Sequence, residues 1–291
     1  MFDRYVAVDW SASSSPKTGA DSIWICNLGG AGDPTTTNPP TRGKAEEQLR
    51  NLLVEAIDHG ERVLIGFDFP YGYPQGFAAA LGLQGLAWSA IWRYLEGNLH
   101  DASPTNENNR FEVASAMNAR LVQHAFWGRP AARRLNSLSM RRDQVRYRID
   151  DEAAGLSEWR QVEVMLHRRG SHPHSVWKLY GAGSVGSQTL TGIPVVYRLR
   201  QDSRLEAISR VWPFEVGVPE LPERRGAVVH AEIWPSLDAI PHQAGLVKDK
   251  VQVIALAEDF RQRDRSSTLA RIFIVPSPAA IEEGWILGAV D

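Results

Sequence analysis

Residues 4–19 read RYVAVDWSASSSPKTG, and this stretch raises the question on which the fold depends. Residues 5–8 form a short apolar run typical of a buried strand, and the run ends on Asp9. A buried strand gains nothing from a carboxylate at its tip, whereas a metal or phosphate site uses one. Small polar residues follow at once, which indicates a loop. Asp9 is therefore the first candidate site residue.

The composition is that of an ordinary folded chain of 291 residues, 43% of them hydrophobic. This length allows one large α/β domain or two small ones. The net charge of −2 creates no overall field that attracts nucleic acid or a membrane surface. Cys26 is the only cysteine, which excludes internal disulfides and fits a reducing compartment. No signal-peptide pattern and no 18-residue apolar run occurs, so we expect a cytoplasmic protein without membrane contact.

A second acidic residue, Asp68, ends the apolar run RVLIGFDFP at residues 62–70. Between these two apolar runs, residues 22–28 have a strand pattern and residues 44–60 have the spacing of an amphipathic helix. A right-handed crossover through that helix makes the strands that end on Asp9 and Asp68 parallel. Because open α/β sheets build their sites at the carboxyl edge, we predict adjacent strands with both carboxylates within reach of one metal.

The middle of the chain, residues 76–170, predicts a helical insertion within a single domain that spans residues 1–291. Residues 86–97 and 106–126 both show helical spacing, and Asn106 or Asn108 are candidate N-caps. No linker-like break separates this part from the rest. The fold class that we expect is therefore α/β, with a mixed sheet, flanking helices and a helical insertion.

Two more acidic residues lie near element ends later in the chain. Glu232 is close to the end of the strand pattern at residues 227–236, and Asp249 lies in the first turn of the helix predicted at residues 247–264. Two divalent cations about 4 Å apart need several carboxylates that converge from different elements. We therefore predict Mg²⁺ or Mn²⁺ at Asp9, Asp68 and Asp249, with Glu232 as a further catalytic residue. The alternative is that each acid only caps its element, and helix starts favour acids in any case.

Six blocks, in chain order, carry a family resemblance: VAVDWSA, IGFDFPYGYP, VWKLYGAGSVGSQTLTGIP, VWPFE, AEIWPSL and VKDKVQVIALA. Together they resemble the uncharacterised RNase H-like family labelled predicted nucleases (domain of unknown function 429). The resemblance spans nearly the whole chain and implies an RNase H-like sheet with a helical insertion. It implies that Asp9 is the first-strand acid, Asp68 the acid on the strand after the first helix, and Asp249 the acid on the late helix. The nuclease label is itself an inference from fold, so it supports the fold better than the chemistry.

Two features depart from the RNase H-like pattern. Residues 29–43 show no clear third strand before the first helix, and residues 251–253 of the late helix lack the second acid that often follows there. The first helix carries several acids that are equal candidates for a helical ligand, namely Glu46, Glu47 and Glu55. These departures keep a role in binding alone open.

The segment GAGSVG, residues 181–186, matches Gly-x-Gly-x-x-Gly after an apolar run. A dinucleotide site needs a βαβ unit, and Pro194 predicts that a helix ends or kinks soon after the glycines. We therefore favour either a tight turn or a nest of backbone N–H groups for an anion. The anion-binding residues predicted for such a nest are Lys178, Gly181, Gly183 and Ser184.

Residues 129–148 hold seven arginines and one acid, a density suited to phosphates of nucleic acid or to a solvated face. The predicted nucleic-acid contacts are Arg141, Arg142, Arg146 and Arg148. Arg160 lies three residues before Glu163, which predicts an ion pair within one helix. Tyr71 and Tyr73, which follow Asp68, are candidates either to stack on a base or to pack within their loop.

Three functions remain open from the sequence. The first is a metal-dependent nuclease that uses the acidic residues, with nucleic acid as its partner. The second is a phosphotransferase or ATPase on the related actin-like fold, for which the turn after Asp9 lacks the usual glycine. The third is a module that binds a nucleotide, metabolite or protein without catalysis. The sequence names neither the substrate nor the oligomeric state.

Overall fold

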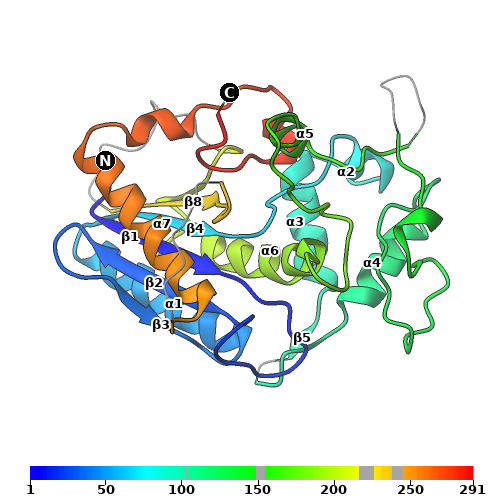
Figure 1. Ribbon diagram of the computed structural model, residues 1–291, viewed down its shortest axis with the longest axis horizontal. Helices are drawn as coiled ribbons and strands as arrows, with labels where there is room; N and C mark the ends of the chain where they lie inside the picture. The colour runs from blue at the N-terminus through cyan, green and yellow to red at the C-terminus, as the bar shows by residue number, and fades with distance from the viewer. Residues whose placement is uncertain (103, 149–154, 216–225, 238–244, 291) are drawn as a thin grey trace.

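The computed structural model describes residues 1–102, 104–148, 155–215, 226–237 and 245–290, which are built around a six-stranded mixed sheet (Figure 1). The strand order is β3-β2-β1-β4-β8-β7. β1 and β3 both pair antiparallel with β2, while β1 and β4, β4 and β8, and β8 and β7 pair in parallel. The strands are β1 (Arg4–Asp9), β2 (Trp24–Gly29), β3 (Thr35–Thr37), β4 (Arg62–Phe67), β7 (Ser209–Val211) and β8 (Ala227–Glu232).

The predicted pairing of the two acid-tipped strands is confirmed. β1 and β4 are adjacent and parallel, with Val8 opposite Phe67, so Asp9 and Asp68 follow at neighbouring positions on one edge. The composition of residues 29–43 predicts a loop. This is wrong for Thr35–Thr37, which forms β3, and for Arg42 and Gly43, with which α1 begins. Its threonines suit an edge strand because they are β-branched, but three residues are too few to stand out among the prolines and glycines around them.

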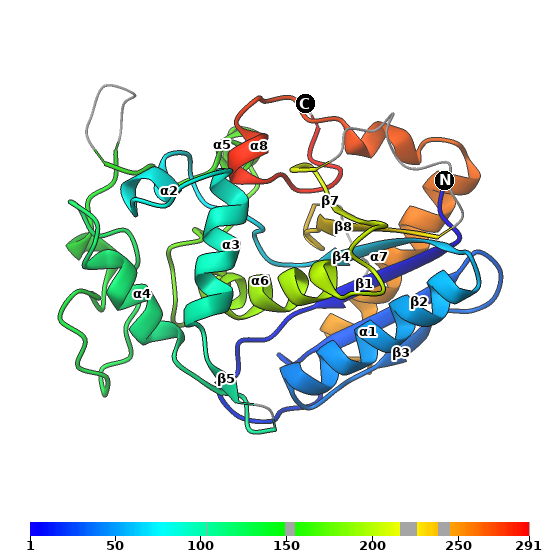
Figure 2. The same cartoon turned by 180° about the vertical axis from the view of Figure 1, so that it is seen from behind.

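Helices cover both faces of the sheet (Figures 1 and 2). α1 (Arg42–Asp58) and α6 (Val185–Gln201) lie on one face, and α7 (Lys248–Arg265) packs on β1 and β2 from the other. Side chains along β1 point alternately to the two faces of the sheet and so contribute to the hydrophobic core on each face. Val6 and Val8 face α1 and α6, while Tyr5 and Ala7 face α7. Asp9 has the same parity as Ala7 and therefore faces the α7 side.

The insertion is only partly helical, which corrects the prediction for residues 76–170. Its elements are α2 (Phe77–Ala80), α3 (Ala87–Asn98), β5 (Asp101–Ala102), β6 (Glu107–Asn108), α4 (Arg110–Asn118), the 3-10 turn η1 (Arg142–Gln144) and α5 (Gln161–Arg168). The helix predicted at 106–126 ends at Asn118, whose amide group hydrogen-bonds backbone groups of Ala125, Phe126 and Ser137. These bonds pair backbone N–H and C=O groups after Asn118 that a helix would otherwise have paired. At the other end of α4, the N-cap is Asn109 rather than Asn106 or Asn108.

α3 packs on α6, so the insertion and the sheet share one hydrophobic core. The chain then ends in the 3-10 helix η3 (Leu269–Phe273) and α8 (Ala280–Glu283). None of the helices in the described part of the chain combines the length and apolar character needed to cross a bilayer.

α6 runs unbroken for 17 residues through Pro194, contrary to the expected break. A proline inside a helix removes one hydrogen bond and costs about 3 kcal/mol. Pro194 is buried, as are most residues of this helix, so the packing of α6 between the sheet and α3 offsets that cost. Gly192 allows this close approach, because a Cβ there would lie 2.3 Å from the Phe69 ring.

Replacing each of two helical glycines by alanine should change the free energy of unfolding in opposite directions. Gly192→Ala should lower the free energy of unfolding by about 1–3 kcal/mol because it overpacks the core against Phe69. A Cβ at Gly97 in α3 would meet no atom of the described residues within 4 Å, so Gly97→Ala should raise the free energy of unfolding by up to about 1 kcal/mol. Urea denaturation of both variants measures this, and a Gly192→Ala protein as stable as the wild type would contradict the packing of α6.

Candidate functional site

Three of the predicted acids meet at the carboxyl edge of the sheet. Asp9 closes β1, Asp68 follows β4, and the start of α7 brings Asp249 to the same face. The backbone N–H of Trp10 donates to Asp68 Oδ1 at 2.6 Å, while the N–H of Asp68 donates to the Val8 carbonyl at 3.1 Å. These bonds orient the Asp68 carboxylate and keep the backbone of Asp68 next to the end of β1.

The electrostatics show that these carboxylates are close enough to repel one another. Burial raises the pKa of Asp9 well above its ordinary value of 3.8, and the charges of Asp68 and Asp249 raise it further, while Lys248 acts in the opposite direction. Burial also raises the pKa of Asp68, with Asp249 adding to it and the hydrogen bond from Trp10 opposing it. A cation bound among these side chains would relieve both the repulsion and the burial of charge.

Asp249 also has a structural contact. Its Oδ2 accepts a hydrogen bond from the backbone N–H of Asp21 at 2.7 Å, which ties the loop after β1 to the start of α7. Among the residues that the structure describes, no group of three or more His, Cys, Asp or Glu side chains is already arranged to hold a metal ion. The three carboxylates thus lie near one another, but they would have to adjust to become ligands of one ion.

The structure does not bring Glu232 into this group. Strand alternation places its side chain on the opposite face of the sheet from Asp68, because it has the parity of Val228 rather than of Ala231. Its two oxygens accept hydrogen bonds from Arg160 at 2.6 and 2.7 Å, and one of them also accepts from the Tyr71 N–H at 2.9 Å. Both oxygens are therefore used within the protein, which leaves the proposed catalytic role of Glu232 without support from this geometry.

The ion pair predicted between Arg160 and Glu163 is confirmed at 2.6 Å, but it belongs to a larger buried cluster. Arg160 is fully buried and lies between Glu163 and Glu232, and it also donates to the carbonyl of Glu283. The cluster connects α5, β8 and α8 across more than 100 residues of sequence. Only the contact within α5 had a local signal, which is why the rest of the cluster could not be read from the sequence.

The glycine-rich segment forms a tight turn before α6. Gly181 and Gly183 have φ values of 87° and 70°, in the left-handed region that glycine tolerates. The Lys178 ammonium group donates a hydrogen bond to the carbonyl of Ala182, so this charged group is used in a contact within the turn. Ser184 is the N-cap but makes no side-chain cap bond. In the described chain, the segment before the glycines forms single bridges rather than a strand, which argues against a dinucleotide site; the anion nest stays a prediction.

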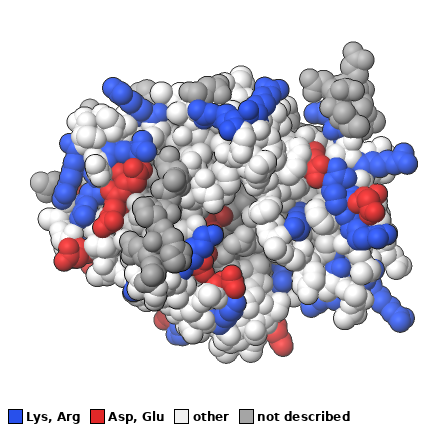
Figure 3. All heavy atoms as spheres, in the orientation of Figure 1, with Lys and Arg blue, Asp and Glu red and all other residues white. Residues whose placement is uncertain are grey.

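The arginine-rich segment does not form a simple basic patch. Arg142 forms a two-point ion pair with Glu158 and lies 4.5 Å from the Tyr147 ring centre, and Arg141 lies 3.6 Å from Asp143. Figure 3 shows acidic side chains interspersed with the basic ones at the right-hand side, over the insertion. Among the described residues, no hydrogen bond or ion pair connects Arg146 to the acidic edge, which is formed by Asp9, Asp68 and Asp249. Nucleic-acid binding by the four predicted arginines stays a prediction.

Tyr71 and Tyr73 are core residues, at 0% and 1% exposure. Stacking of either ring on a ligand base is therefore wrong, and packing of the loop after Asp68 is the observed alternative. Tyr73 packs against Phe77 and Trp177, with ring centres 4.7 and 5.2 Å apart.

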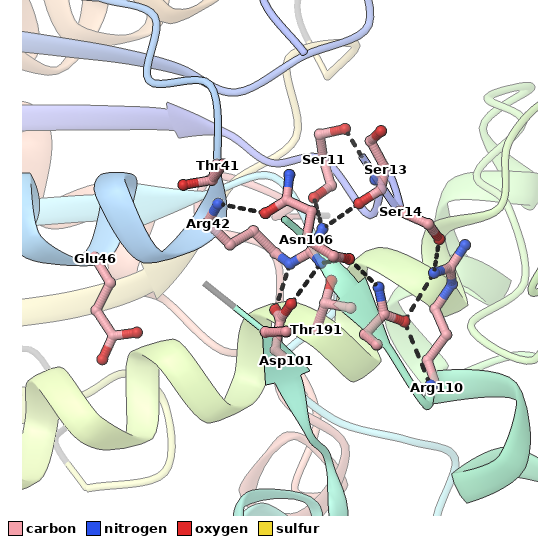
Figure 4. Close-up of polar contacts among 12 residues, drawn as sticks. Ser11, Ser13, Ser14, Thr41, Arg42, Glu46, Asp101, Asn106, Arg110 and Thr191 are labelled. Carbon is pink, nitrogen blue, oxygen red and sulfur yellow. Dashed lines mark hydrogen bonds and ion pairs between the residues drawn. The ribbon is translucent and has the colours of Figure 1, made fainter. Parts of the chain in front are cut away.

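A polar cluster that sequence reasoning missed fixes the loop after Asp9 (Figure 4). Arg42 at the start of α1 is 1% exposed and pairs with Asp101 of β5. Its Nη1 donates to the carbonyls of Ser11 and Ser13 at 3.1 and 2.7 Å. Arg42 therefore anchors the loop that leaves Asp9. Because its partners lie about 30 and 60 residues away in the sequence, no local sequence pattern predicts this role.

Comparisons with protein-family models, curated proteins and solved structures found no match to this chain. What the site does must therefore be inferred from its own geometry.

The acidic site should make stability depend on pH. Since the pKa values of Asp9 and Asp68 are raised, the folded protein retains protons that the unfolded chain releases above about pH 4. Without divalent cations, the free energy of unfolding should fall as the pH increases through the neutral range. Asp9→Asn should reduce that fall and be at least about 1 kcal/mol more stable than the wild type at pH 8.

Urea denaturation at pH 5 and pH 8 in the presence of a chelator measures this difference. Asp58→Asn is the control, because it removes an exposed carboxylate that pairs with Arg204 on the surface. Equal pH dependence in the wild type and Asp9→Asn would show that Asp9 is an ordinary surface acid.

Proposed function

We propose that this protein is a divalent-metal-dependent nuclease on an RNase H-like fold. The observation that carries the proposal is the adjacent, parallel pairing of β1 and β4, which places Asp9 and Asp68 side by side with Asp249 within repulsive range. Oxygen ligands from separate rigid elements suit Mg²⁺ or Mn²⁺.

The topology supports the RNase H-like assignment. β3 supplies a third antiparallel strand before α1, so one of the two departures from that pattern is removed. The acids lie on the first strand, directly after the strand that follows the first helix, and on the late helix, as the resemblance implies. The late helix still lacks a second acid, since residues 251–253 are Val, Gln and Val.

In this proposal Asp9 and Asp68 hold the cation, and Asp249 completes its coordination from α7. When bound, the metal would lower the pKa of a water molecule and stabilise the charge that develops on the phosphate oxygens. The hydrogen bond from Trp10 orients Asp68, and the bond from the Asp21 N–H orients Asp249. Both bonds reduce the movement needed before the carboxylates can bind, which favours catalysis by a preorganised site.

A binding module without catalysis is the second candidate. Two observations favour it: the carboxylates are not arranged as a ligand set within the described residues, and the late helix has no second acid at residues 251–253. Such a protein would share the fold and the acidic edge but would not cleave a phosphodiester.

Metal binding and cleavage should be measured separately. Mg²⁺ or Mn²⁺ should raise the melting temperature of the wild type and do so much less for Asp9→Asn, because the cation removes a repulsion that the variant lacks. Manganese-dependent cleavage of labelled single-stranded DNA, RNA and a hybrid duplex should fall at least about 100-fold in Asp9→Asn and Asp68→Asn.

Asp58→Asn again serves as the control and should behave like the wild type in both assays. Metal-dependent stabilisation without cleavage of any substrate would favour the binding module. Equal stabilisation of wild type and Asp9→Asn would refute a metal site at this edge.

A further inference from the structure

Arg110, the first residue of α4, is buried, and no described carboxylate pairs with it. It is 8% exposed, and its guanidinium donates to neutral groups among the described residues. Nη1 donates to Ser14 Oγ at 2.9 Å (Figure 4). It also donates to Asn108 Oδ1 at 2.8 Å, and Nε donates to Ser187 Oγ at 2.9 Å. Nη2 has no hydrogen-bond partner in the described parts of the chain.

Among the described residues, the charges that act most strongly on Arg110 leave one cation uncompensated. These charges belong to Arg42, Arg133, Asp101 and Glu112. The two acids are already used, because Asp101 pairs with Arg42 and Glu112 pairs with Arg133. Burial, followed by the charges of the neighbouring arginines, lowers the pKa of Arg110 to about 10, so the side chain is still charged at neutral pH. A buried charge without a counter-ion is unfavourable, and an anion would remove that cost.

The surroundings of Arg110 suit a phosphate group. Ser14 lies on an exposed part of the loop after Asp9 and accepts a hydrogen bond from Nη1 of the guanidinium. Ser187 lies in the first turn of α6, where the helix dipole favours negative charge. The Ser187 hydroxyl donates to the Leu179 carbonyl, which leaves its oxygen to hold Nε in place. A guanidinium fixed at one end, with Nη2 available, matches the oxygens of a phosphate better than a point charge does.

This position is close to the acidic edge. Gln188, next to Ser187 in α6, donates its side-chain amide to the carbonyl of Trp10, the residue after Asp9. The loop of residues 11–15 therefore begins close to Asp9 and contacts Arg110 through Ser14. Arg42 holds the same loop through the carbonyls of Ser11 and Ser13.

We propose that Arg110, with Ser14, binds a phosphate group of the substrate whose reacting phosphate lies at Asp9 and Asp68. The identity of that phosphate as part of the nuclease substrate rests on the proposed function, whereas the binding of phosphate at Arg110 does not. The ligand class is a phosphate mono- or diester, either as a small molecule or at the end of a nucleic-acid strand.

Binding should be measured by calorimetry in the presence of a chelator, so that the acidic site is not loaded. The probes are inorganic phosphate and a short oligothymidylate with either a 5′-phosphate or a 5′-hydroxyl. The wild type should prefer the phosphorylated strand. Arg110→Gln should weaken its binding at least about tenfold, because charge-assisted hydrogen bonds are lost. Arg110→Lys should lie between the two, because it keeps the charge but not the fork.

Arg134→Gln is the matched control, since it removes an exposed arginine of the neighbouring segment and should change binding little. Ser14→Asp serves if Arg110→Gln does not fold. It places a carboxylate next to Nη1, so it should raise the melting temperature and at the same time remove phosphate binding.

Unchanged phosphate binding in Arg110→Gln or in a folded Ser14→Asp would overturn the site. Binding of inorganic phosphate without preference for the phosphorylated strand would overturn its connection to a nucleic-acid substrate. These measurements need neither metal nor cleavage. Failure of Arg110 to bind phosphate can therefore be distinguished from failure of the protein to cleave nucleic acid.

Discussion

Backbone hydrogen bonds between β1 and β4 hold two acidic strand ends side by side, and the candidate site depends on that pairing. The parallel register places Asp9 and Asp68 at one edge, where the sheet cannot relax to separate them. α7 then packs across the same face and adds Asp249 from its first turn. The repulsion among these groups is thus a consequence of how the core is built, since the residues that precede them on both strands are buried.

Buried charges in this protein fall into two kinds. Arg160 is surrounded by Glu163 and Glu232, and Arg42 is paired with Asp101, so these clusters satisfy themselves and connect distant elements. Removing one member of such a pair would leave the other buried and unpaired, which is why both clusters read as structural. The acidic edge and Arg110 are different. The acids of the edge raise one another's pKa, and among the described residues Arg110 forms no ion pair with a carboxylate.

The two uncompensated groups have opposite sign and lie at the two ends of the loop of residues 11–15. A cation at the acidic edge and a phosphate at Arg110 would each remove an unfavourable burial of charge. A ligand that carries phosphates and binds through a metal would satisfy both ends together. This complementarity joins the proposed nuclease activity to the fold more directly than the arginine-rich segment does, because Arg142 there is used by Glu158.

The sequence by itself determined the strands that end on Asp9 and Asp68, the helix between them and the parallel pairing that follows, because burial leaves a period of hydrophobicity and crossovers have one hand. It also determined the pair of Arg160 and Glu163, whose spacing is local. Tertiary structure alone decided which face each acid occupies, so that Glu232 joins Arg160 instead of the acidic edge. It likewise decided that α6 continues through Pro194, and that Arg42 pairs with Asp101 while Arg110 has no carboxylate partner in the described part of the chain. These outcomes depend on contacts between residues far apart in the chain, and such contacts leave no periodic signal in the sequence.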